Sequence, residues 1–213
     1  MTSESTAAPR RLRPTQWVGL GLVVVGLVAA GIGAWQLWGT NIGTERAQHR
    51  FLKELQDLPT KPAPIDAPPL QTPPAQQAFM VIAIPRMHVR AAVVEGVRPE
   101  DLALGPGHVP GTALPGAGTN IAIAGHRATH GAPFARIETL RVGDVVTLQT
   151  KNGVYFYEVI AQNGKPWRLV QPTDVAVLAP GNREMLTLIS CHPQWASTNR
   201  VIVLATPIRS SIQ

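Results

Sequence analysis

The sequence predicts a mostly-β domain, either a closed barrel or a sandwich, preceded by a single membrane-spanning helix. Three features of the 213 residues support this: an uncharged apolar run near the N-terminus, a proline-rich stretch, and a series of short β-prone runs from Phe79 onward. The formal net charge is +6, with only 15% charged residues. Basic residues beyond the apolar run are scattered and few aromatic residues interleave them, which argues against nucleic-acid binding.

The apolar run covers residues 17–38 and reads WVGLGLVVVGLVAAGIGAWQLW. At about 1.5 Å per residue it makes a helix of roughly 33 Å, which matches a hydrocarbon core of about 30 Å. Trp17, Trp35 and Trp38 suit the headgroup level. A cleavable signal peptide is the alternative, but the run is longer than an h-region and continues past any cleavage site. Arginines before the run predict a cytoplasmic tail, residues 1–16, and an extracellular remainder.

Two segments separate the predicted anchor from the β-prone region. Residues 39–58 carry apolar side chains at helical spacing among mixed charges, which predicts a juxtamembrane helix that acts as a solvated stalk. Residues 59–78 contain seven prolines. Because proline fixes φ and removes a donor, this stretch is expected to be a semi-rigid extended spacer that holds the domain off the membrane. The folded domain then covers residues 79–213.

The folded region alternates β-prone runs with Gly, Pro and Asn signals. The turn Lys151–Asn152–Gly153 predicts a hairpin. This many short strands favour a closed barrel or a sandwich, and closure would remove exposed sheet edges. Strands are expected at residues 79–85, 89–96, 119–125, 144–150, 154–161, 185–191 and 200–206. Short helical pieces, each started by a proline, are expected around residues 99–102, 133–140 and 172–177.

The chain has a single cysteine, Cys191, at the end of the run MLTLISC. Exported domains usually hold paired cysteines or none, because a free thiol outside the cell is open to oxidation. A lone cysteine forms no intramolecular disulfide. Cys191 is therefore either a buried small hydrophobe or a reactive group kept for its chemistry, and the count alone leaves both interpretations open.

Two other polar residues fall at strand ends. His126 follows NIAIAG, and Arg200 opens RVIVLA across a loop from Cys191, so that the cysteine and the arginine would face each other. A thiolate needs a cationic neighbourhood, histidine exchanges protons near neutral pH, and a guanidinium suits a developing oxyanion. These residues would supply the nucleophile, acid/base and charge stabiliser of acyl transfer. A capping histidine and a solvated edge arginine are the structural alternatives.

Metal and calcium sites are not expected. His126 and His130 have a metal-ligand spacing only on a helix, and Gly125, Gly131 and Pro133 argue against a helix there. Acidic residues of the barrel region are sparse and unclustered. No cofactor is predicted.

At these residues the sequence resembles the sortases, which are membrane-anchored cysteine transpeptidases. The family motif TLxTC appears as residues 187–191, with the arginine of the following strand at Arg200. Residues 123–148, IAGHRATHGAPFARIETLRVGDVVTL, resemble the histidine segment of actinobacterial class E and D enzymes. Residues 105–116, GPGHVPGTALPG, resemble a block typical of class E. The similarity covers about residues 79–207.

The resemblance implies an eight-stranded sortase β-barrel with Cys191, His126 and Arg200 at one end. It implies cleavage of an LAxTG- or LPxTG-like C-terminal sorting signal between Thr and Gly, through a thioacyl-enzyme at the cysteine. His126 would protonate the leaving amine and later deprotonate the incoming one. The partners would be secreted proteins with a sorting signal, and an amine of a peptidoglycan precursor or, in pilus-building relatives, a pilin lysine.

Two positions differ from the family pattern. Ser190 replaces the usual threonine before the cysteine, and Val109 stands where many class E relatives have a tyrosine associated with reading the signal. The signal read by this chain can therefore differ from LAxTG. Ser190, Val109 and His108 are the predicted substrate-binding residues, and His130 and His192 are expected to be bystanders. A catalytically silent anchored β-domain that binds peptide or wall material is the alternative from another functional class.

Overall fold

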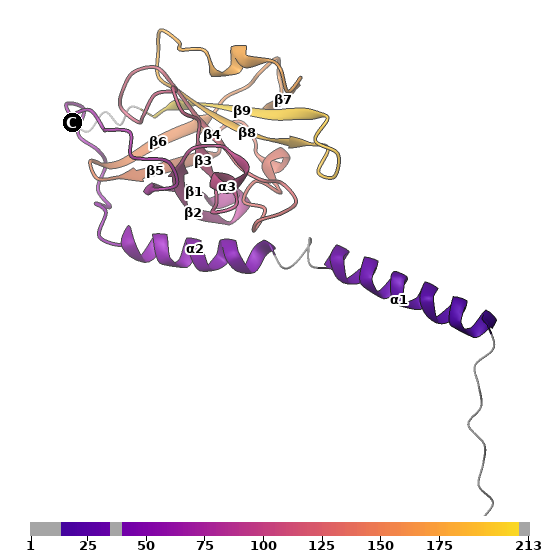
Figure 1. Cartoon of the computed structure of the whole chain (residues 1–213). Helices are drawn as coiled ribbons and strands as arrows, with labels where there is room; N and C mark the ends of the chain where they lie inside the picture. Colours follow the sequence, from indigo (N-terminus) through magenta and orange to yellow (C-terminus); the bar gives the residue numbers. More distant parts are fainter. Residues whose placement is uncertain (1–13, 35–39, 209–213) are drawn as a thin grey trace, which may run out of the picture.

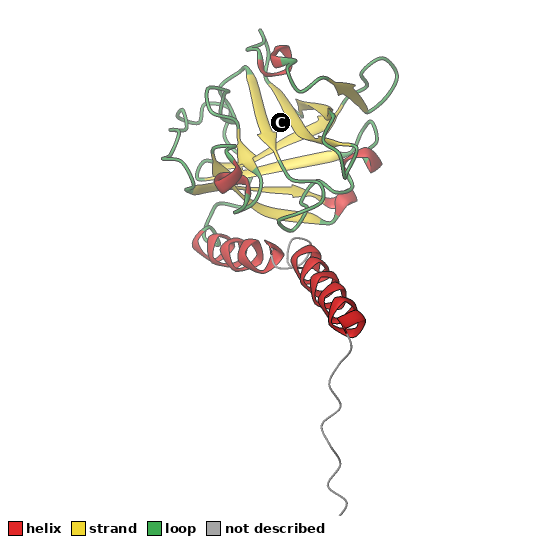
Figure 2. Ribbon diagram, turned by 45° about the vertical axis from the view of Figure 1, so that its right-hand side comes forward, coloured by secondary structure: helices red, strands yellow, loops and turns green. Residues whose placement is uncertain are grey.

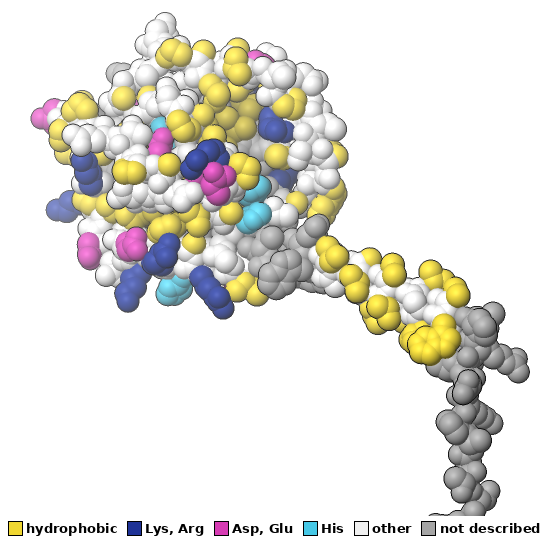
Figure 3. Space-filling model, viewed as in Figure 1, with side chains coloured by type: hydrophobic (Ala, Val, Ile, Leu, Met, Phe, Trp, Pro, Cys, Tyr) yellow, Lys and Arg dark blue, Asp and Glu magenta, His cyan; other side chains and the backbone are white. Residues whose placement is uncertain are grey.

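Two helices precede the β domain in the computed structural model, which describes residues 14–34 and 40–208 (Figure 1). They are α1 (Pro14–Ala34) and α2 (Thr40–Glu54). Hydrophobic side chains are spread along the visible surface of α1, between white atoms (Figure 3). Within the described ranges, no helix is both long and apolar enough to cross a membrane. The predicted span, residues 17–38, continues into residues 35–38, which lie outside the described residues, as do residues 1–13 of the predicted tail.

In the described residues, nine strands form one continuous sheet, and the helices lie at its periphery (Figure 2). The strand order is β6-β5-β1-β2-β3-β4-β8-β9-β7, and β6 also pairs with β9. This last pairing closes eight strands into a ring, while β7 pairs with the first half of β9. The predicted closed eight-stranded barrel is therefore confirmed. The strands are β1 (Ala78–Ile84), β2 (Val89–Glu95), β3 (Gly107–His108), β4 (Asn120–Ala124), β5 (Val145–Thr150), β6 (Gly153–Val159), β7 (Trp167–Val170), β8 (Met185–His192) and β9 (Asn199–Pro207).

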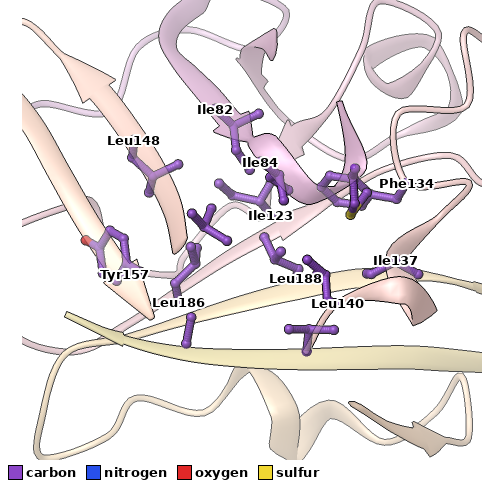
Figure 4. Packing of buried hydrophobic residues seen from close by; sticks show 14 of the residues in the cluster. Ile82, Ile84, Ile123, Phe134, Ile137, Leu140, Leu148, Tyr157, Leu186 and Leu188 are labelled. Carbon is purple, nitrogen blue, oxygen red and sulfur yellow. The ribbon is translucent and has the colours of Figure 1, made fainter. Parts of the chain in front are cut away.

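The barrel interior is filled by every second residue of its strands. Ile82 and Ile84 of β1 meet Ile123 of β4 and Leu186 and Leu188 of β8 in one buried cluster (Figure 4). Each of these side chains is fully buried. Burying one such side chain contributes about 2 kcal/mol, so the period-two pattern both predicts the strands and stabilises the closed barrel.

Two of the three expected short helical pieces are smaller than predicted. Helix α3 (Pro99–Leu102) lies where the sequence predicts it. The expected helix at residues 133–140 contains only the 3-10 turn η3 (Ile137–Thr139), and the third piece is η4 (Val175–Leu178). A further turn, η2 (Pro85–Met87), joins β1 to β2. Strands β3 and β7 were not predicted.

Helix α2 is packed against the barrel, so its interpretation as a solvated stalk is wrong. Ala47 and Phe51 are buried in a small cluster with Ala92 and Val94 of β2. The Gln48 side chain accepts from the Ala92 amide at 2.8 Å and donates back to the Ala92 carbonyl at 3.0 Å. This pair of hydrogen bonds fixes α2 on the outer surface of β2.

The proline-rich segment also lies on the barrel, and its prediction as a spacer away from the domain is wrong. Pro62 forms a β-bridge with Val154 of β6. Gln149 of β5 donates to the carbonyl of Pro59 at 3.2 Å, and Asn152 of the β5–β6 turn donates to that of Pro68 at 2.8 Å. Proline has no backbone N–H to donate, but its carbonyl can still accept a hydrogen bond. These prolines are therefore bound to the hairpin through their carbonyls, which accept from its side chains. The segment leads from α2 along the β5–β6 hairpin to β1.

Candidate active site

Cys191 and Arg200 are direct cross-strand partners in the antiparallel pairing of β8 with β9. Residues opposed in this way present their side chains to the same face, with Cβ atoms about 5 Å apart. Leu188 of β8 and Val201 of β9 pack in the core. Because side chains alternate along a strand, Cys191 and Arg200 lie on the outer face of the barrel.

His126 reaches the same place from the other side of β8. The ladder between β4 and β8 is parallel, and it continues past β4 where the Gly125 amide donates to the Ile189 carbonyl at 3.0 Å. This register sets His126 level with Cys191. The side chain of Ile123 points into the core. Because successive side chains alternate between the two faces, the side chain three residues later, that of His126, points outward as well. The structure thus brings His126, Cys191 and Arg200 to the ends of three adjacent strands.

The imidazole of His126 stacks on that of His130, with ring centroids 4.7 Å apart and an angle of 23° between planes. Burial lowers the pKa of His126 below its usual 6.5, and the neighbouring His130 lowers it further. In the described part of the chain, the buried Nε2 of His126 has no hydrogen-bond partner. A neutral imidazole with an unbonded nitrogen suits a group that exchanges protons with a substrate. His130 is therefore a neighbour of the site and not a bystander.

The Arg200 guanidinium is held by the β8–β9 loop. Its Nη1 donates to the carbonyls of Ser197 and Asn199, both at 3.0 Å. Arginine stays charged at any physiological pH. The loop therefore fixes a permanent positive charge beside Cys191, where negative charge would develop during attack on a carbonyl.

A second row of charged residues lies beneath the first, at the end of the barrel interior. Arg127 is only 8% exposed, and its Nη2 lies 2.7 Å from Glu138 Oε2. His192 Nδ1 lies 2.7 Å from the other oxygen of Glu138. Burial opposes ionisation of Glu138, but Arg127 and His192 outweigh it and hold its pKa below the usual value. His192 therefore joins Arg127 and Glu138 in one hydrogen-bonded network, and its expected place outside the chemistry stays a prediction.

Arg127 and Glu138 were not among the predicted site residues. Arg127 directly follows His126, so the period-two alternation that turns His126 outward would turn Arg127 inward. That signal was available in the sequence. Nothing in the sequence marks Glu138, which reaches the site from η3.

His108 lies away from the surface, and its role in substrate binding stays a prediction. It is fully buried in β3. Its Nδ1 lies 2.7 Å from Glu95 Oε2, and its Nε2 lies 2.9 Å from the Ala113 carbonyl. Both ring nitrogens are thus bonded inside the protein, and the residue joins β2, β3 and the loop after β3.

Ser190 is also buried, and its role in substrate binding stays a prediction. Its hydroxyl donates to the Gly125 carbonyl at 2.8 Å, which ties β8 to the residue before His126. A Cβ on Gly125 would lie 2.8 Å from the Phe134 ring, so glycine is needed where this loop turns. Val109 is half-buried, with its amide bonded to the Ala122 carbonyl at 2.9 Å, and its role stays a prediction.

Comparisons with known proteins identify relatives of this chain. A family model described as the sortase domain matches residues 82–208. Sortase SrtE1 of Streptomyces coelicolor is 28% identical over 204 residues, which cover 87% of this chain and 55% of that protein. Sortase D of Bacillus subtilis is 28% identical over 187 residues, which cover 83% of this chain and 88% of that protein. This chain thus spans little more than half the length of the Streptomyces relative.

Solved structures show the same barrel. The structure of sortase E1 from Streptomyces coelicolor with a tripeptide in the active site matches with a TM-score of 0.56 and 30% identity, covering 62% of this chain and 89% of that one. A sortase E mutant from Streptomyces avermitilis matches with a TM-score of 0.53 and 33% identity, covering 64% and 91%. Since the family model covers more than half of the residues and ends beyond the site, the chain belongs to the sortase family.

Proposed function

We propose that this chain is a membrane-anchored, class E-like cysteine transpeptidase that cleaves an LAxTG- or LPxTG-like C-terminal sorting signal between Thr and Gly. One observation carries the proposal: Cys191 is opposed to Arg200 across one ladder and level with His126 along the other. A nucleophile, an acid/base and a fixed positive charge thus meet on one outer face, where an extended peptide has access.

The proposed reaction has two acyl transfers. The Cys191 thiolate attacks the threonine carbonyl, and Arg200 stabilises the oxyanion of the tetrahedral intermediate. His126, as imidazolium, gives its proton to the departing glycine amine, which leaves a thioester on Cys191 and a neutral imidazole. An incoming amine then attacks the thioester, and His126 accepts its proton as the thiolate departs.

The lowered pKa of His126 bears on this scheme. Neutral imidazole predominates at pH 7, so the imidazolium required for the first step is a minor population. Small changes around His126 would then alter the rate by altering that population, without changing the chemical steps.

Features of the sequence support the proposed location, and the relatives support the proposed partners. The arginines before residues 17–38 and the apolar character of that run support an anchored enzyme with its barrel outside the cell. The substrates would be secreted proteins with a sorting signal, and the acceptor an amine of a peptidoglycan precursor. The tripeptide in the active site of the Streptomyces coelicolor structure supports a peptide substrate for this barrel type.

The test is a transpeptidation assay on the detergent-solubilised full chain. A library of LxxTG peptides is incubated with triglycine, lysine or diaminopimelate, and products are identified by mass spectrometry. We expect cleavage between Thr and Gly, an acyl adduct on Cys191, and loss of all turnover in Cys191→Ala. Turnover retained in Cys191→Ala would remove Cys191 as the nucleophile. A folded wild-type chain that cleaves no member of the library would favour the silent peptide-binding alternative.

A further inference from the structure

The ladder between β4 and β8 ends in an unusual way next to Cys191. The last backbone rung runs from the Gly125 amide to the Ile189 carbonyl. In a parallel ladder the Cys191 amide would next bond the Gly125 carbonyl, and the residue 127 amide would then bond the Cys191 carbonyl. The Arg127 side chain takes that place, and its Nη1 donates to the Cys191 carbonyl at 3.2 Å.

The guanidinium of Arg127 is fixed by partners on two other elements. Glu138 of η3 binds Nη2 at 2.7 Å and also accepts from His192 Nδ1 at 2.7 Å. A buried arginine without such a carboxylate would be strongly destabilising, so the pair is expected to stay formed throughout turnover. Arg127 thereby links the β4 end, η3 and the carbonyl of the nucleophile residue.

The backbone of His126 is consequently held on both sides by residues that flank Cys191. Before it, the Gly125 carbonyl accepts from the Ser190 hydroxyl at 2.8 Å. After it, the Arg127 carbonyl accepts from Gln194 Nε2 at 3.2 Å, beyond Cys191 in the β8–β9 loop. Of these three contacts, the one made by the guanidinium reaches the carbonyl of Cys191 itself.

From this arrangement we propose that Arg127 is a positioning residue which keeps His126 in register with Cys191, with Glu138 and His192 holding its guanidinium in place. Arg127 faces the barrel interior and touches no reacting atom. The expected effect of Arg127 on turnover rests on the proposed function. Its expected effect on the distance between the His126 imidazole and the Cys191 thiol is independent of that function.

Kinetics of the full chain test the effect on turnover. Arg127→Met keeps the approximate side-chain volume and removes every hydrogen-bond donor. We expect kcat to fall roughly 10- to 100-fold, because misplacement of a catalytic group by about 1 Å has effects of this size. KM for the peptide should change less than about threefold, because Arg127 does not touch the substrate. Arg127→Lys restores one donor and is expected to recover part of kcat. Glu138→Gln keeps the shape but loosens the guanidinium, and a smaller loss of kcat is expected.

A second measurement does not depend on turnover. The rate of Cys191 labelling by a methanethiosulfonate reagent reports the thiolate fraction that His126 supports, and we expect it to fall at least about fivefold in Arg127→Met. All variants should label at one rate in guanidinium chloride. Arg98→Met is the matched control, because Arg98 also pairs with a carboxylate, Asp101, at 3.1 Å but lies at α3. It should label and turn over like the wild type.

The outcomes separate the two proposals. A wild type without turnover contradicts the proposed function, while labelling still tests the role of Arg127. A folded Arg127→Met protein with wild-type kcat and labelling rate would overturn the positioning role. If Arg127→Met does not fold, the variants Glu138→Gln and His192→Gln are measured in its place. Wild-type kcat and labelling rates in both variants would overturn the proposal. A fall in kcat together with a fall in the labelling rate would support it.

Discussion

Cys191 and Arg200 face each other across β8 and β9, and the loop between them is tied to the guanidinium through the carbonyls of Ser197 and Asn199. Their separation is therefore set by a backbone ladder and not by the flexibility of a long side chain. A charge held in this way needs no reorganisation when an oxyanion forms beside it.

Arg200→Lys is expected to lower kcat roughly 100-fold or more, because a flexible ammonium cannot bond both loop carbonyls and present a fixed charge to the oxyanion. Steady-state kinetics with a cleaved LxxTG peptide would measure this. Arg90→Lys, at an exposed position of β2, is the matched control and should keep its activity. A near-wild-type rate in Arg200→Lys would make Arg200 a structural residue.

The pairing of Cys191 with Arg200 could be predicted because strands joined by a short loop are often neighbours in a sheet. The seven longer strands were predictable for a similar reason, since alternation of apolar residues is a local signal. Strand β3 has two residues, Gly107 and His108, which is too few for any period to show. Strand β7 was missed because Arg168 and Leu169 are both exposed, so no buried face is apparent in its sequence.

The charged network under the site depends on tertiary contacts that no local pattern encodes. In this network the Glu138 carboxylate is hydrogen-bonded to His192, which lies 54 residues away in the sequence. The same holds for a pair outside the network, Glu95 and His108, which are hydrogen-bonded between neighbouring strands. The docking of α2 was missed because Phe51 and Ala47 form a narrow apolar stripe among charges, which is equally typical of a solvated helix.

His130→Gln is expected to raise the pKa of His126 while leaving it below 6.5, because burial is the larger cause of the lowering and the charge of His130 the smaller. A pH titration of the histidine ring signals by NMR would measure the shift, with His49→Gln on the exposed side of α2 as control. An unchanged or lower pKa of His126 in His130→Gln would show that the stacked ring exerts no electrostatic effect.

The lowered pKa of His126 also predicts a loss of stability in acid. A histidine with a folded-state pKa below 6.5 takes up its proton in the unfolded chain first, so the free energy of unfolding falls as pH drops below about 6.5 towards the folded-state value. Urea unfolding between pH 7.5 and 5 would measure this slope. His126→Gln should show a shallower decrease over the same range, and an equal slope in both proteins would contradict the assignment.

Helix α2 is expected to contribute both stability and site order. Phe51 is 6% exposed against β2, and Asn41 Oδ1 accepts from the Gly131 amide at 2.9 Å, next to His130. Phe51→Ala should lower the free energy of unfolding by about 2 kcal/mol or more, as for other large-to-small changes in a packed cluster. Denaturant unfolding would measure this, with His49→Ala as the matched surface control on the same helix. Equal stability of the two variants would mean that α2 is not bound to β2 in solution.

The buried pair of Glu95 and His108 is expected to stabilise the barrel without taking part in turnover. Because both side chains are removed from water, taking away one partner leaves the other without its hydrogen bond in the interior, which costs about 3 kcal/mol. His108→Ala and Glu95→Ala should each lower the free energy of unfolding by about this amount, and the double variant by clearly less than the sum. Additive losses in this double-mutant cycle would show that the two residues do not interact. A His108→Ala variant that loses kcat but keeps its full stability would show that His108 takes part in substrate binding or turnover.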